Sequence, residues 1–174
     1  SAHQVHGSKV VTHQSGWDGW LRTDSADGHA SAHHDTAMVV TVADCVPVFI
    51  GHPKGASALL HAGWRGVAGG ILGAGIHALQ AMGHQPRDLV LHLGPAICGA
   101  CYVVGPDVYA KLMRRSVDAP SPVDLRALLA DQARIAGVKE IDVSPFCTKC
   151  NNDRFYSHRA GDTARQVAVI APSA

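Results

Sequence analysis

Two residues of metal-binding type interrupt or follow short apolar stretches of this chain, and a third lies near its N-terminus. Cys45 interrupts the apolar stretch 38–50, and His61 directly follows the apolar stretch 56–60. His6 lies in the motif QVHG near the N-terminus. Two imidazoles and one thiolate suit Zn²⁺ or copper, and three protein ligands leave the fourth position of a tetrahedral ion for water or substrate. A plainer interpretation is equally open, because a single cysteine in a strand is most often a small buried hydrophobe and 12 histidines can lie together by chance.

Cationic side chains form a second group of candidates. Arg65 stands between Trp64 and a glycine-rich stretch, where a guanidinium group can bind phosphate or carboxylate through two parallel hydrogen bonds. Arg159 belongs to the motif FYSHR, whose aromatic residues could stack on a base or a ring. Exposed arginines usually only interact with solvent, so position alone favours Arg65 and then Arg159 as substrate-binding or phosphate-binding residues. The same C-terminal segment also contains Lys149, Arg154 and His158.

Four of the five cysteines fall into two C-x-x-C units, Cys98–Cys101 and Cys147–Cys150. Two such units can form a Cys₄ zinc site, but the 45 residues between them far exceed the spacing of a compact zinc ribbon. CGAC follows a Gly-Pro turn, and CTKC lacks the strand-to-helix setting of a thioredoxin motif. We therefore expect reduced cysteines that pack near one another, with a second zinc site as the alternative.

Length and composition describe one globular domain and exclude several classes of function. The chain has 174 residues, of which 47% are hydrophobic and 17% are charged. Its formal net charge of +1, without a basic block, predicts no nucleic-acid partner. No apolar run is long enough for a membrane span, and no export signal precedes residue 10, so we expect a reduced, cytoplasmic protein. The P-loop, the dinucleotide-binding glycine motif and the G-x-S-x-G motif are all absent from the sequence.

The hydrophobic pattern predicts a mixed α/β domain in layers, with a mixed sheet and flanking helices. Strands are expected at 38–42, 46–50, 56–60, 88–93, 140–143 and 165–170, and helices at 65–82, 106–115 and 124–137. The polar segment 24–35 is expected to be a surface connection. Because the first helix would begin just after His61, its positively polarised N-terminus would face the candidate site.

The order of several motifs resembles that of a known family. QVHG, ADCVP, HAGWRG, LGPAIC and CTKC with FYSHR follow one another between residues 4 and 170. In this order they resemble the multicopper-polyphenol-oxidase-like family, also described as the laccase-domain or purine nucleoside phosphorylase family, of which the macrophage laccase-domain protein is a human member. The most specific feature is HAGWRG preceded by the cysteine of ADC, since Cys45 lies sixteen residues before His61.

The resemblance implies an α/β fold and a metal site formed by His6, Cys45 and His61. The family was first described as copper-dependent laccases that oxidise polyphenols. It was later assigned zinc-dependent phosphorolysis of adenosine, inosine, guanosine and methylthioadenosine, together with deamination of adenosine. The expected partners are therefore a small purine nucleoside and phosphate.

The residues themselves favour zinc over copper. A multicopper oxidase needs several copper ions and paired H-x-H motifs, and this sequence contains no H-x-H. A single His₂Cys site suits zinc chemistry better, although the H-x-E and P-C-x-x-C motifs of the usual zinc deaminases are missing. We therefore predict a zinc-dependent purine nucleoside enzyme, with a copper-dependent polyphenol oxidase and a non-catalytic, metal-stabilised binding module as alternatives.

The resemblance carries one further expectation, about the N-terminus. Members of the family extend beyond the QVHG motif on its N-terminal side, whereas only three residues precede QVHG here. Either the given sequence of residues 1–174 omits that segment, or this member of the family lacks it. In the second case we expect part of the sheet and part of the pocket to be missing.

Overall fold

Short apolar strands separated by turns pair into one mixed sheet at the centre of the molecule. A computed structural model describes residues 1–14 and 18–172 of the chain. The sheet has six strands in the order β1-β2-β5-β4-β6-β9. These strands are β1 (Val10–His13), β2 (Gly28–Ser31), β5 (Ser57–Ala62), β4 (Val46–Gly51), β6 (Val90–Leu93) and β9 (Glu140–Val143).

The sheet combines both kinds of strand pairing. β4 and β5 are antiparallel neighbours at its centre, while β1 pairs with β2, and β6 with β9, in parallel. Every residue of β5 is buried, which explains its near-continuous apolar sequence. The parallel pairing of β6 with β9 brings the segments that follow these two strands to the same edge of the sheet.

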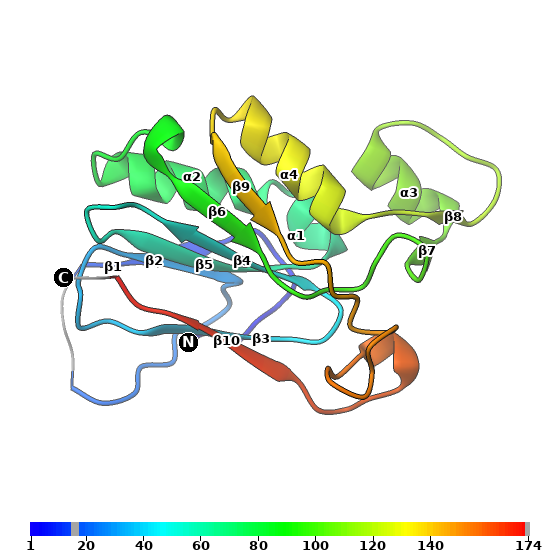
Figure 1. The fold of residues 1–174 in the computed structure, drawn as a ribbon, viewed down its shortest axis with the longest axis horizontal. Helices are drawn as coiled ribbons and strands as arrows, with labels where there is room; N and C mark the ends of the chain where they lie inside the picture. The colour runs from blue at the N-terminus through cyan, green and yellow to red at the C-terminus, as the bar shows by residue number, and fades with distance from the viewer. Residues whose placement is uncertain (15–17, 173–174) are drawn as a thin grey trace.

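Two further layers cover the two faces of the sheet (Figure 1). The helices α2 (Ile71–Ala81) and α4 (Leu125–Ile135) pack on one face over the main hydrophobic core. On the other face, β3 (Met38–Val42) pairs with β10 (Gln166–Ile170) in an antiparallel ribbon, and a smaller core forms around Leu59. Two short helices, α1 (Trp64–Ala68) and α3 (Pro106–Met113), and a small ribbon of β7 (Val103–Val104) with β8 (Ser121–Pro122) complete the fold, together with the 3₁₀ turns η1 (Pro86–Asp88) and η2 (His158–Ala160).

This architecture confirms the predicted mixed α/β domain with flanking helices. The expected helix at 124–137 is α4, and Asp124 caps it by accepting hydrogen bonds from the backbone N–H groups of Arg126 at 2.9 Å and Ala127 at 3.2 Å. Within the part of the chain that the structure describes, no helix is both long and apolar enough to cross a membrane.

Two predictions of local structure were wrong. The helix expected at 65–82 is divided into α1 and α2, because Gly70 adopts a left-handed conformation with φ 81° between them. The segment 24–35, expected on the surface, contains β2, in which all four residues are buried. β2 lies between β1 and β5, so its polar residues enter the interior of the sheet.

Candidate metal centre and pocket

The turn between β3 and β4 places Cys45 next to the end of β5, which contains His61. β4 begins directly after Cys45, and Pro47 is paired with His61 across the two strands. The turn is tight, since Asp44 has a left-handed backbone with φ 76°. The thiol is therefore attached to a rigid strand end beside a buried imidazole.

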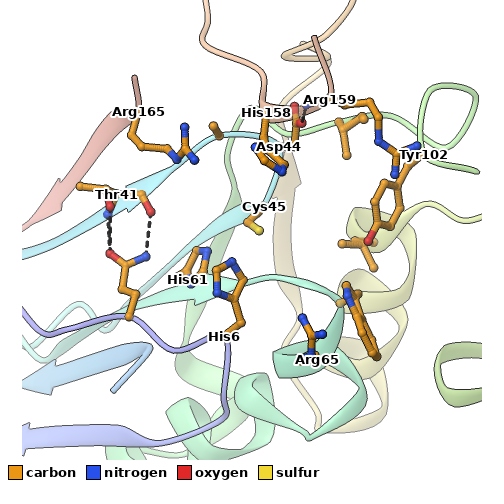
Figure 2. Close-up of a pocket in the computed structure, with 15 residues that line it drawn as sticks. His6, Thr41, Asp44, Cys45, His61, Arg65, Tyr102, His158, Arg159 and Arg165 are labelled. Atoms are coloured by element: carbon orange, nitrogen blue, oxygen red, sulfur yellow. Dashed lines mark hydrogen bonds between the residues drawn. The ribbon is translucent and has the colours of Figure 1, made fainter. Parts of the chain in front are cut away.

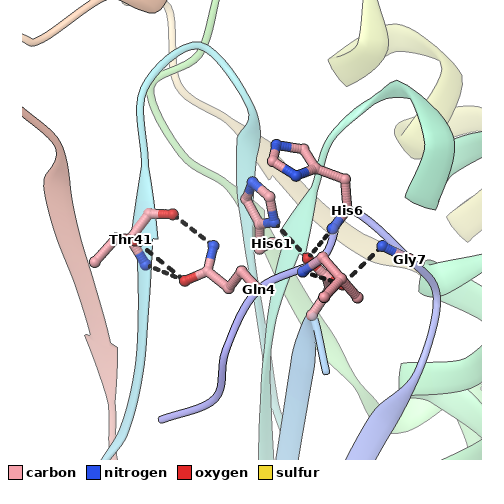
Figure 3. Close-up of polar contacts among 7 residues, drawn as sticks. Gln4, His6, Gly7, Thr41 and His61 are labelled. Atoms are coloured by element: carbon pink, nitrogen blue, oxygen red, sulfur yellow. Dashed lines mark hydrogen bonds and ion pairs between the residues drawn. The ribbon is translucent and has the colours of Figure 1, made fainter. Parts of the chain in front are cut away.

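His6 reaches the same place from the N-terminal segment, which is fastened to the edge of β3 by Gln4. The side-chain amide of Gln4 donates to the carbonyl of Thr41 and accepts from its N–H, both at 2.8 Å (Figure 3). These two bonds reproduce the pairing of a neighbouring strand. Two residues later the chain bends sharply, with φ 60° at His6, and the imidazole turns toward His61, whose ring centroid is 4.7 Å away.

Asp27 connects the backbone of His6 to the ring of His61. Its fully buried carboxylate lies 2.8 Å from Nδ1 of His61. The same carboxylate accepts hydrogen bonds from the backbone N–H groups of His6 at 2.9 Å, Gly7 at 2.7 Å and Val5 at 3.2 Å. The contact with Nδ1 leaves Nε2 of His61 as the nitrogen that faces Cys45 and His6, and a carboxylate partner of this kind is typical of metal-binding histidines.

The ligand atoms of His6, Cys45 and His61 all lie within 4.8 Å of one another. Zinc bonds of about 2.0–2.3 Å would place such atoms roughly 3.3–3.6 Å apart in a tetrahedron, so small side-chain rotations suffice to close them around one ion. Gly63 makes room for this arrangement, because a Cβ there would lie 3.0 Å from Cys45 Sγ and 3.1 Å from His6 Cδ2. The donor set and its surroundings therefore fit a single metal ion with one open position.

The electrostatics of the group favour the thiolate form of Cys45. Burial opposes ionisation of the Cys45 thiol, but hydrogen bonds and positive charge from His6 and His61 lower its pKa from 9.0 to about 7. Burial disfavours the charged form of His61 as well, but its bonds to Asp27 and Cys45 raise its pKa from 6.5 to about 9. Cys45 therefore supplies a thiolate, the form that binds metals, near neutral pH.

A cavity of about 490 Å³ opens above these three residues, a volume in the range of small-molecule sites. Figure 2 shows His6, Cys45 and His61 close together in the middle of the view, with Arg65, Tyr102 and Arg159 on one side of them and Thr41 and Arg165 on the other. The lining comprises Gln4, His6, Thr41, Ala43, Asp44, Cys45, His61, Trp64, Arg65, Ile97, Tyr102, Leu125, His158, Arg159 and Arg165.

Each of the two predicted arginines lies beside an aromatic ring in this cavity. The guanidinium carbon of Arg65 is 4.5 Å from the ring centroid of Trp64, and among the residues that the structure describes no carboxylate pairs with Arg65. The guanidinium carbon of Arg159 is 5.2 Å from the ring centroid of Tyr102, and its Nη1 donates to the carbonyl of Val103 at 3.2 Å. Both cations therefore retain free N–H donors toward the cavity.

Asp44 fixes the C-terminal side of the cavity. One of its carboxylate oxygens accepts a hydrogen bond from Thr148 Oγ1 at 2.7 Å, and the other accepts one from the backbone N–H of Arg159 at 2.7 Å. These bonds join the turn before Cys45 to a segment more than a hundred residues away. The long connection between β9 and β10 thereby becomes one wall of the pocket.

The structure thus gathers all five candidate residues, His6, Cys45, His61, Arg65 and Arg159, around one cavity. Of Lys149, Arg154 and His158, only His158 lines it, while Arg154 stacks over Phe146 at 4.8 Å. The expected approach of a helix N-terminus is not supported in the predicted form, because α1 has only five residues.

Sequence reasoning missed several residues of the site. Asp27 gave no local signal, since its contact with His61 joins residues 34 positions apart. Asp44 occurs in the motif ADCVP and Tyr102 directly follows Cys101, and neither position has a sequence signature of a wall-forming residue. Arg165 lines the cavity just before β10, in a segment predicted only as a strand.

A second group that could hold a metal consists of Cys98, Cys101, Cys147 and Cys150. Among residues 1–14 and 18–172, no other set of three or more histidine, cysteine or acidic ligands is this close together. The described chain therefore offers no cluster of histidines for a multinuclear copper site.

The fold and the site define a class of mixed α/β proteins in which two histidines and a cysteine converge beside a pocket of arginine and aromatic side chains. The family described as multi-copper polyphenol oxidoreductase laccase matches residues 1–173, and the chain belongs to this family. It is similar to proteins named purine nucleoside phosphorylase, among them ORF3 of Streptomyces griseus. The two sequences are 31% identical over 177 residues, which cover 97% of this chain and 72% of the relative.

A further sequence relative and two solved structures are also similar to this chain over nearly its whole length. The protein named purine nucleoside phosphorylase Rv2149c, from Mycobacterium tuberculosis, is 35% identical over 97% of this chain and 70% of its own length. The crystal structure of YlmD from Geobacillus stearothermophilus matches with a TM-score of 0.88 and 30% identity, over 98% of this chain and 72% of that one. YfiH from Bacillus licheniformis matches with a TM-score of 0.89 and 25% identity, over 99% of this chain and 73% of that one.

Proposed function

We propose that this protein is a zinc-dependent enzyme of purine nucleosides, with His6, Cys45 and His61 as the zinc ligands. One observation carries the proposal: the three candidate ligands converge, with Asp27 bonded to His61, in a cavity that Arg65 and Arg159 also line. The names of the relatives add the substrate class, since phosphorolysis requires a nucleoside and phosphate. Adenosine, inosine, guanosine and methylthioadenosine are the proposed substrates.

A zinc ion in this ligand set would act as a Lewis acid, polarising a water molecule or a substrate oxygen at its open position. The protein's own groups would provide binding and orientation. The guanidinium groups of Arg65 and Arg159 are suited to bind phosphate through paired hydrogen bonds. The rings of Trp64 and Tyr102 offer flat faces on which a purine can stack.

Phosphorolysis in this cavity would proceed by substitution at the anomeric carbon of the sugar. An oxygen of phosphate forms a bond to C1′ while the bond from C1′ to the purine nitrogen breaks, and the purine leaves with the electron pair and takes up a proton. The imidazole of His158, which lines the cavity, is a suitable proton donor. The arginines hold the phosphate on one side of the sugar, so that the reacting atoms are brought together in a fixed orientation.

Deamination of adenosine is the second reaction proposed for the same pocket. Water adds to the purine carbon that carries the amino group, and ammonia leaves to give inosine. This reaction needs no phosphate, so that the two activities can be separated by their substrate requirements.

The test is adenosine turnover with and without phosphate, using protein whose metal content has been measured. Adenine formed only with phosphate, at about one zinc per pocket, would establish phosphorolysis, and inosine formed without phosphate would establish deamination. No product from fully zinc-loaded protein would refute the proposal for adenosine, and the same assay would then be applied to the other three nucleosides.

Arg65→Ala tests the phosphate-binding role. We expect the KM for phosphate to rise roughly tenfold or more, because a charged hydrogen-bond pair is lost. Arg134→Ala is a matched control, since Arg134 is an exposed arginine on α4 that pairs with Asp131. An unchanged KM for phosphate in Arg65→Ala would remove Arg65 from this role.

The two alternatives make different predictions. A copper-dependent polyphenol oxidase would contain several copper ions and would oxidise phenols in air, whereas the zinc protein would be colourless and inactive on them. A metal-stabilised binding module would unfold when Cys45 is replaced by alanine. The catalytic site predicts a folded but inactive Cys45→Ala variant.

A further inference from the structure

The four remaining cysteines come together outside the pocket. The Sγ atoms of Cys98, Cys101, Cys147 and Cys150 lie within 4.8 Å of one another, and those of Cys101 and Cys150 are 3.4 Å apart. None of the four forms a disulfide. The large sequence separation that argued against a joint site is therefore no obstacle in the folded chain.

The sheet topology explains how the two C-x-x-C units meet. One unit follows β6 and the other follows β9, and these two strands are parallel neighbours whose last residues, Leu93 and Val143, are paired. Beyond the strands, Ala96 and Cys147 form a parallel bridge, and the N–H of Thr148 donates to the carbonyl of Ala96 at 3.2 Å. Both C-x-x-C units therefore lie side by side at the same edge of the sheet.

The local backbone is arranged around the sulfur of Cys147. This side chain is buried, and its Sγ accepts hydrogen bonds from the backbone N–H groups of Cys98 at 3.3 Å and Cys150 at 3.4 Å. Each C-x-x-C unit also closes a turn, with the N–H of Cys101 donating to the carbonyl of Cys98 and the N–H of Asn151 donating to that of Cys147, both at 3.0 Å. Backbone N–H groups directed at a sulfur stabilise its thiolate form.

We propose that Cys98, Cys101, Cys147 and Cys150 bind one zinc ion as a structural site, separate from the ligands in the pocket. Zinc–sulfur bonds of about 2.3 Å place the sulfurs of a tetrahedral site roughly 3.8 Å apart, which the observed group can reach with small rotations. Four sulfur ligands leave no open position, so this site stabilises the fold and takes no part in chemistry.

The proposed ion would hold together two walls of the pocket. Cys101 is followed directly by Tyr102, and the segment that begins at Cys147 continues to Arg159, which stacks on the Tyr102 ring. The connection between β9 and β10 contains only a single 3₁₀ turn, η2, and connections of this length are seldom ordered without added support. A zinc crosslink near its start would supply that support.

Cys45→Ala protein is the best material for the test, because its only cysteines are the four in question. We expect this protein, purified under reducing conditions, to retain one zinc per chain. Loaded with cobalt(II) instead, it should show the intense visible bands of a tetrahedral cobalt–thiolate complex. Adding Cys150→Ser should abolish both signals, whereas adding Lys149→Ala, in the same turn but without a thiol, should leave both unchanged.

A measurement on Cys45→Ala protein alone avoids the risk that Cys150→Ser prevents folding. Titration of Cys45→Ala protein with a thiol-reactive mercurial should release its zinc in step with modification of four thiols. If Cys45→Ala does not fold, the test uses the wild-type protein, which should bind two zinc ions. The ion that a chelator removes last should then be released when the thiols are modified. The proposal is overturned by folded protein without bound metal at these cysteines, by iron as the native ion, or by disulfide-linked peptides between the two units.

Discussion

Replacing Asp27 with asparagine isolates the role of one buried charge in the candidate metal centre. The carboxylate is fully buried and serves His61 Nδ1 and the backbone N–H groups of Val5, His6 and Gly7. Asparagine has nearly the same shape, and its oxygen can still accept from His6 and His61. Its amide nitrogen, however, would face the N–H groups of Gly7 and Val5, where a donor meets a donor.

The structure sets the size of the expected effect. Two hydrogen bonds to a charged group are lost, and at about 1.5–3 kcal/mol each the free energy of unfolding should fall by about 3–6 kcal/mol. Loss of the carboxylate that orients His61 should also weaken zinc binding by roughly 10-fold to 100-fold. Both effects have one origin, because Asp27 holds the backbone of His6 and the ring of His61 together.

Urea denaturation of the metal-free protein and chelator competition for zinc would measure the two effects separately. Asp24→Asn is the matched control, since Asp24 lies three residues away and is exposed. Burial opposes ionisation of Asp27, but hydrogen bonds from His61 and the backbone lower its pKa below 3.8, so its stabilising contribution is present above pH 3.8 and lost in stronger acid. If the free energies of unfolding of the wild-type and Asp27→Asn proteins differ by less than about 0.5 kcal/mol, and their zinc affinities are equal, the reasoning is refuted.

Two further predictions concern the same centre. In metal-free protein, alkylation of Cys45 followed by peptide mass spectrometry should be half-maximal near pH 7, because the histidines lower the thiol pKa to about 7, and bound zinc should protect it. His61→Gln should move this midpoint toward 9.0, and a wild-type midpoint already at 9.0 would contradict the assignment of the thiolate. Gly63→Ala should weaken zinc binding by roughly tenfold or more while the protein stays folded, because its Cβ would crowd Cys45 Sγ at 3.0 Å and His6 Cδ2 at 3.1 Å. Gly73→Ala, whose Cβ meets nothing within 4 Å, is the control, and equal zinc affinity in the two variants would show that the site adapts to the added methyl group.

Several features of the fold could be predicted because their signals are local. The amphipathic pattern and the capping residue Asp124 locate α4 within two residues at each end. The apolar run that forms β5 is recognisable because this strand is buried on both faces. The single helix predicted at 65–82 failed for a reason of the same local kind, since Gly70 takes a left-handed conformation that the apolar periodicity does not reveal.

The contacts between distant parts of the chain could not be predicted in this way. Nothing near Asp27 in the sequence indicates that it lies under His61, because β2 reaches the interior only through its pairing with β1 and β5. The Cys₄ group is a similar case. Its two halves meet because β6 and β9 are parallel neighbours, and a linear spacing of 45 residues contains no information about that pairing.

The sequence by itself determined which chemistry the protein could perform, through the residue types at His6, Cys45 and His61 and through the arginines of its motifs. Donor atoms belong to side chains, and the short stretches around them predict strands and turns from local preferences alone. Only the tertiary structure decided that these groups share one cavity, that a buried carboxylate orients one of them, and that four other cysteines form a separate cluster. Such arrangements depend on strand order and register, which are set by the packing of the whole chain.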